Sequence, residues 1–185
     1  AYSIVCELRL PALLTALLAG SALGVAGLLM QTVFDNPLAD PSILGVNAGA
    51  GLGAAVCLLL MGGALGGSFV GLGGLLTVSL GAFVGAAGVM AVLALCASVL
   101  RHHLMLLVAG VMISYAVGAV VTLLSFFASA DGLRSYVVWG MGSYGSVGLD
   151  ALPVFATLVC VGLGVALCLG IPLNALLLGD AYAQN

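Results

Sequence analysis

The fold of this chain is decided by the stretch Asp35-Asn36-Pro37-Leu38-Ala39-Asp40-Pro41-Ser42-Ile43-Leu44-Gly45, where two prolines interrupt two long apolar runs. Each proline removes a backbone donor and clashes with the preceding turn, so no helix continues unbroken through Pro37 and Pro41. Irregular backbone at membrane depth is tolerated only where it is packed in protein or lines a wet cavity. This break is therefore the first candidate for a functional site.

The composition on both sides of the break identifies an integral membrane protein. Of 185 residues, 64% are hydrophobic and 5% are charged, whereas soluble domains carry roughly a quarter charged residues. Lysine is absent, and the three arginines are far too few to neutralise a phosphate backbone, so nucleic-acid binding is excluded. The five cysteines show no metal-ligand spacing, and the four in apolar runs are interpreted as small packing residues. Cys6 lies outside the spans and is a candidate exposed thiol.

Apolar runs of about 20 residues predict membrane-spanning helices. We expect an all-α, polytopic membrane helix bundle that forms one transmembrane domain over residues 1–185. Its spans are expected at about residues 11–34, 44–61, 69–100, 104–128 and 151–170. A short helix over Leu133–Trp139 is expected at the membrane interface, where aromatic side chains gather.

Glycines recur at helical spacing in three of these runs. The pairs Gly20/Gly24 and Gly81/Gly85 fit the GxxxG pattern of close helix contacts. A phosphate-binding loop is excluded for the series that begins at Gly49, because the P-loop motif requires a lysine. The glycines therefore predict close packing of helices.

The predicted spans contain no Asp, Glu, Lys or Arg, and no catalytic motif is visible. Ion-coupled pumps place ionisable groups inside the membrane, so the sequence indicates a non-catalytic conduit that receives its energy from elsewhere. An ion-coupled secondary transporter, which also uses broken helices, and a non-transporting assembly subunit are the alternatives. His102 and His103 fit an interfacial loop, with metal ligation or titration as the second interpretation.

Several motifs, in order along the chain, resemble the FecCD-type permeases, the membrane subunits of type II ABC importers for iron-siderophores, haem and cobalamin. They are Arg9-Leu10-Pro11, Asn36-Pro37-Leu38-Ala39-Asp40-Pro41, Leu44-Gly45, Leu133-Arg134-Ser135, Trp139-Gly140-Met141-Gly142-Ser143 and Leu173-Asn174-Ala175-Leu176-Leu177-Leu178-Gly179-Asp180-Ala181-Tyr182-Ala183. The resemblance covers the whole chain and implies the type II importer permease fold. Because such permeases have about ten spans, we expect a fragment covering about spans two to six.

The resemblance also implies roles for particular residues. A cytoplasmic gate of the pathway would involve Asn36, Pro37, Leu38, His103 and Leu104. A coupling-helix region over 171–185 would contact the ATPase through Leu176, Leu177, Gly179, Asp180, Ala181 and Tyr182. Arg9 and Arg134 would dock the binding protein, although Ala12 stands where the family usually has a second docking arginine.

The resemblance finally implies partners and a location. The expected partners are a cytoplasmic ATP-binding subunit, a periplasmic or lipoprotein substrate-binding protein, a second permease copy in a homodimer, and membrane lipid. This chain would bind no cofactor or metal itself, since ATP would bind to the partner subunit. The expected location is the bacterial inner (cytoplasmic) membrane, crossed several times.

Overall fold

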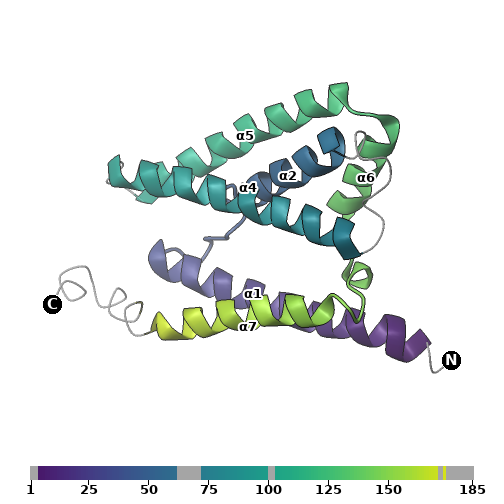
Figure 1. The fold of residues 1–185 in the computed structure, drawn as a ribbon. Coiled ribbons are helices and arrows are strands. Elements are labelled where there is room, and N and C mark those ends of the chain that lie inside the picture. Colours follow the sequence, from purple (N-terminus) through teal and green to yellow (C-terminus); the bar gives the residue numbers. More distant parts are fainter. Residues whose placement is uncertain (1–3, 62–71, 100–102, 171–172, 174–185) are drawn as a thin grey trace. The chain divides into compact units, whose positions relative to one another are not determined.

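The computed structural model describes residues 4–61, 72–99, 103–170 and 173, and every regular element in these ranges is a helix (Figure 1). In chain order the elements are η1 (Ile4–Arg9), α1 (Leu10–Val33), α2 (Val46–Ala55), η2 (Val56–Met61), α4 (Leu72–Val99), α5 (His103–Phe127), α6 (Ala130–Met141), η3 (Tyr144–Ser146) and α7 (Leu152–Cys168). The predicted all-α class is confirmed.

Three helices are long and apolar enough to cross a membrane, namely Ile4–Val33, Leu76–Val99 and Met105–Phe127. They coincide with the first, third and fourth predicted spans. The second and fifth correspond to shorter apolar helices, Val46–Leu60 and Leu152–Cys168. That these two also cross the bilayer stays a prediction, and so does the single transmembrane domain over 1–185.

The chain separates into two compact units: residues 1–40 with 143–185, and residues 41–142. In the first unit, α1 and α7 lie side by side and run in the same direction (Figure 1). Pro11 and Thr15 near the start of α1 are buried, and η3 packs against this helix. Pro11 lies in the first turn of α1, directly after η1.

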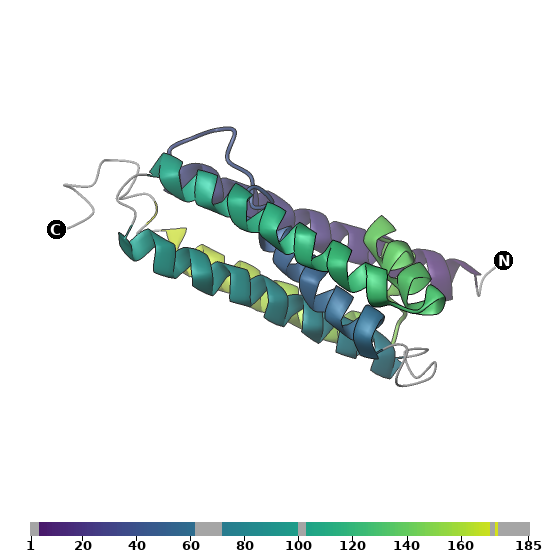
Figure 2. The same cartoon turned by 90° about the horizontal axis from the view of Figure 1, so that it is seen from above.

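In the second unit, α2 packs along α4 in the opposite direction and also along α5 (Figures 1 and 2). Glycines make the close contact between α2 and α4 possible. A Cβ on Gly49 would lie 2.6 Å from the carbonyl oxygen of Gly85, and one on Gly53 would overlap the backbone of Gly81. The predicted contact role of Gly81 and Gly85 is therefore confirmed, since small residues let membrane helices approach closely.

The other predicted glycine pair behaves differently. A Cβ on Gly20 or Gly24 would meet no atom within 4 Å in the part of the chain that the structure describes. Helix α1 instead faces α7 with its other side, through Ala22, Ala26 and Leu29. No helix contact forms at Gly20 and Gly24 within the described residues, so the contact predicted there stays a prediction.

Helix α6 is longer than the predicted segment Leu133–Trp139, since it extends over Ala130–Met141. Ser129 caps its start, and the Ser129 hydroxyl accepts a hydrogen bond from the Gly132 amide at 3.2 Å. Gly132 also lies against η2, because a Cβ there would sit 2.8 Å from the carbonyl oxygen of Leu58. The absence of a side chain at Gly132 thus lets α6 pack closely against η2 within the second unit.

Candidate functional site

Helix α1 ends immediately before the prolines, in a hydrogen-bonded C-terminal cap. The amide of Asn36 donates to the carbonyl of Gln31 at 3.1 Å, and that of Asp35 donates to the carbonyl of Thr32 at 3.4 Å. Asp35 has φ 45° and is the only non-glycine residue with positive φ in the described ranges. This pattern is a Schellman motif, in which glycine is usual at the left-handed position.

The Asn36 side chain then organises the turn that contains Pro37. Its Oδ1 accepts a hydrogen bond from the Leu38 amide at 2.9 Å, and its carbonyl accepts one from the Ala39 amide at 3.0 Å. Pro37 fits the second position of this turn because its φ is already fixed near the required value. The turn presents Leu38, which is 83% exposed, while Ala39 is buried.

A second ordered turn follows on the side of α2. The Gly45 amide donates to the Ser42 carbonyl at 3.1 Å, and Gly45 itself, at φ 78°, precedes α2. Leu44 is buried against Gly110 of α5, where a Cβ would lie 2.9 Å from the Leu44 Cα. A Cβ on Gly45 would lie 2.8 Å from the Ser114 hydroxyl. Leu44 and Gly45 therefore fix the start of α2 on α5.

The structure brings Asn36, Pro37 and Leu38 together in one turn. These three residues belong to the first unit, whereas His103 and Leu104, at the start of α5, belong to the second. That the two sets meet at one gate stays a prediction. Neither the left-handed Asp35 nor the Asn36 turn was predicted, although an Asn-Pro pair is a known turn signal.

The two predicted docking arginines are both exposed. Arg9 is the last residue of η1, directly before α1, and Arg134 lies on α6. They belong to different units, so a shared docking surface stays a prediction. The predicted ATPase-contact residues, namely Leu176, Leu177, Gly179, Asp180, Ala181 and Tyr182, lie outside the described residues.

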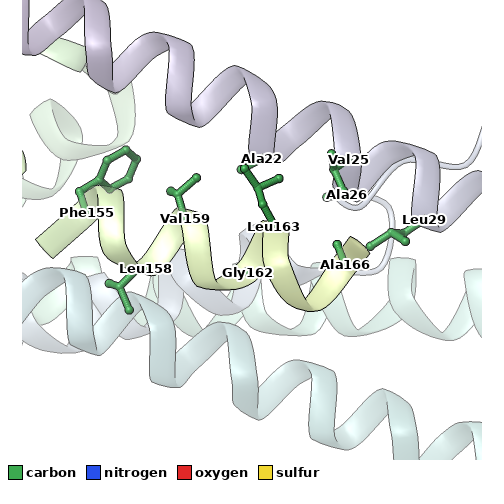
Figure 3. A pocket seen from close by; sticks show the side chains of 10 residues that line it. All are labelled: Ala22, Val25, Ala26, Leu29, Phe155, Leu158, Val159, Gly162, Leu163 and Ala166. Carbon is green, nitrogen blue, oxygen red and sulfur yellow. The ribbon is translucent and has the colours of Figure 1, made fainter. Parts of the chain in front are cut away.

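A groove that the sequence did not predict lies between α1 and α7 (Figure 3). Its volume is about 380 Å³. The lining is entirely apolar: Ala22, Val25, Ala26, Leu29, Phe155, Leu158, Val159, Gly162, Leu163 and Ala166. Because specific ligand sites carry a few placed polar groups, we assign no ligand to this groove.

The described helices carry almost no charge that could bind an ion. Among the residues that the structure describes, no three His, Cys, Asp or Glu side chains converge as a metal site. The polar side chains inside the spans mostly bond to their own helix, as when the Ser114 hydroxyl donates to the Gly110 carbonyl at 2.9 Å.

Long apolar helices that are free of Asp, Glu, Lys and Arg are typical of a multi-pass membrane protein. The chain belongs to the FecCD transport family, whose model matches residues 1–185. Members of this family are permease subunits of ABC transporters. The family predicted from the motifs is thereby confirmed.

Similar proteins agree with this assignment. The chain is 34% identical over 184 residues to the vitamin B12 import system permease protein BtuC of Citrobacter koseri, covering 98% of this chain and 52% of that protein. The same identity over 184 residues holds for BtuC of Salmonella paratyphi A, covering 98% of this chain and 53% of that protein. The chain thus spans about half the length of these relatives.

A solved structure described as an inward-facing conformation of a metal-chelate type ABC transporter superposes with a TM-score of 0.82 at 28% identity. The match covers 99% of this chain and 56% of that one. The type II importer permease fold expected from the sequence is confirmed.

Proposed function

We propose that this chain supplies part of the membrane pathway of an ATP-driven importer for a bulky metal chelate of the cobalamin, haem or iron-siderophore class. The observation that carries the proposal is the family match over residues 1–185, together with 34% identity to vitamin B12 import permeases. The chain itself is a non-catalytic subunit and binds no cofactor. ATP is hydrolysed by a separate cytoplasmic subunit.

The uncharged helices support this function physically. A large chelate carries its own polar groups, so a strongly charged wall would hold it and slow its release. Helices α1, α2, α4, α5 and α7 contain no Asp, Glu, Lys or Arg. Two copies of the permease form the pathway at their interface, and a solute-binding protein delivers the chelate from outside the inner membrane.

The turn at Asn36–Leu38 is proposed as part of the cytoplasmic gate, together with His103 and Leu104. Its support is the exposed Leu38 on a turn that the Asn36 side chain holds through one hydrogen bond. A rigid-body movement of segment 171–185 by the ATPase would be transmitted to such a turn. Arg9 and Arg134 are proposed to dock the binding protein.

Transport by the reconstituted protein with its ATPase and binding protein tests the function. We expect uptake of one chelate among cobalamin, haem and a ferric siderophore, and loss of uptake when the ATPase is omitted. Uptake that persists without the ATPase, or that collapses with an uncoupler while ATP is present, would instead indicate the ion-coupled alternative. Absence of uptake with all partners present would favour the assembly-subunit alternative.

The gate has its own test with matched variants. Asn36→Ala removes the acceptor of the Leu38 amide, whereas Asn36→Asp retains an oxygen at that position. We expect increased leak or reduced uptake for Asn36→Ala and Leu38→Ala, and a smaller effect for Asn36→Asp. Leu17→Ala, which truncates an exposed side chain in the middle of α1, is the control. Normal leak and uptake in the first two variants would exclude a gating role.

A further inference from the structure

We draw no further inference here: the strongest candidate, the exposed phenol of Tyr115 at the middle of the spanning segment Met105–Phe127, has no hydrogen-bond partner among the described residues, and nothing in the structure shows what covers it.

Discussion

Gly53 of α2 and Gly81 of α4 lie backbone to backbone, so closely that no Cβ fits on either residue. Gly49 and Gly85 repeat this relationship one turn away. Apolar side chains contact hydrocarbon whether two membrane helices are apart or packed together, so the hydrophobic effect does not drive their association. Association depends instead on close van der Waals packing of this kind. This contact therefore holds α2 and α4 together in the second unit.

Substituting alanine at Gly53 should separate these two helices. Overpacking of a tight contact costs about 1–3 kcal/mol, so we expect Gly53→Ala to lower the melting temperature of the protein in detergent. Gly88→Ala on α4 is the control, because a Cβ there meets no atom within 4 Å in the described structure. An unchanged melting temperature for Gly53→Ala would show that the contact is not tight.

Gly45 should tolerate alanine poorly for two separate reasons. Its φ of 78° costs about 1–2 kcal/mol for a residue with a Cβ, and the added atom would press on the Ser114 hydroxyl. We expect reduced thermal stability for Gly45→Ala and little change for Gly118→Ala, where the space is open. Equal stability of the two variants would contradict the left-handed start of α2.

Asp35 occupies a left-handed position that glycine adopts without strain. Asp35→Gly should therefore raise the free energy of unfolding by about 1 kcal/mol, and Asp35→Val should lower it, since β-branched residues disfavour positive φ. Denaturant titration in detergent micelles measures both changes. A stability loss in Asp35→Gly would mean that the aspartate side chain contributes more than its strained backbone costs.

Thr15 is 3% exposed, and its hydroxyl has no hydrogen-bond partner within the described residues. An unpaired buried hydroxyl costs about 1–3 kcal/mol, so Thr15→Val should leave stability unchanged or raise it. Thr15→Ala, which also removes a methyl group, should lower it. A clear loss of stability in Thr15→Val would reveal a partner for the hydroxyl.

Burial raises the pKa of the Tyr136 phenol above its ordinary value of 10.0. The neutral form is thus favoured in the folded protein, and its contribution to stability is complete below pH 10 and is lost as the pH rises through the raised pKa. Tyr136→Phe should weaken the loss of stability seen above pH 10. Unfolding measured at several alkaline pH values, with Tyr144→Phe as the exposed control, tests this.

The sequence predicted the helical class and the positions of the three long apolar helices, because transfer of apolar residues into lipid depends on composition and length. The prolines at 37 and 41 likewise predicted the end of α1, since the loss of a backbone donor is a local effect. For Asn36, the sequence predicted only an interruption of the helix and not the hydrogen-bonded turn that this residue forms. Its hydrogen bonds depend on the conformation of the neighbouring residues.

The two glycine pairs show what a spacing pattern leaves open. Gly20/Gly24 and Gly81/Gly85 have the same spacing, yet within the described structure only the second pair receives a partner helix. Spacing determines that two glycines share a face, but not which helix covers it. The left-handed Asp35 was missed for a similar reason, because its own residue type favours no such conformation strongly.

By itself, the sequence determined that this is a helical membrane protein whose first long helix ends before Pro37, since hydrophobic length and proline positions act locally. Its motifs also indicated the FecCD family, which the match over residues 1–185 shows. Only the tertiary structure decided which glycines lie between helices, which side of α6 is covered, and that Asn36 holds the turn that exposes Leu38. These features depend on contacts between segments far apart in the chain or on backbone geometry, which residue order alone does not specify.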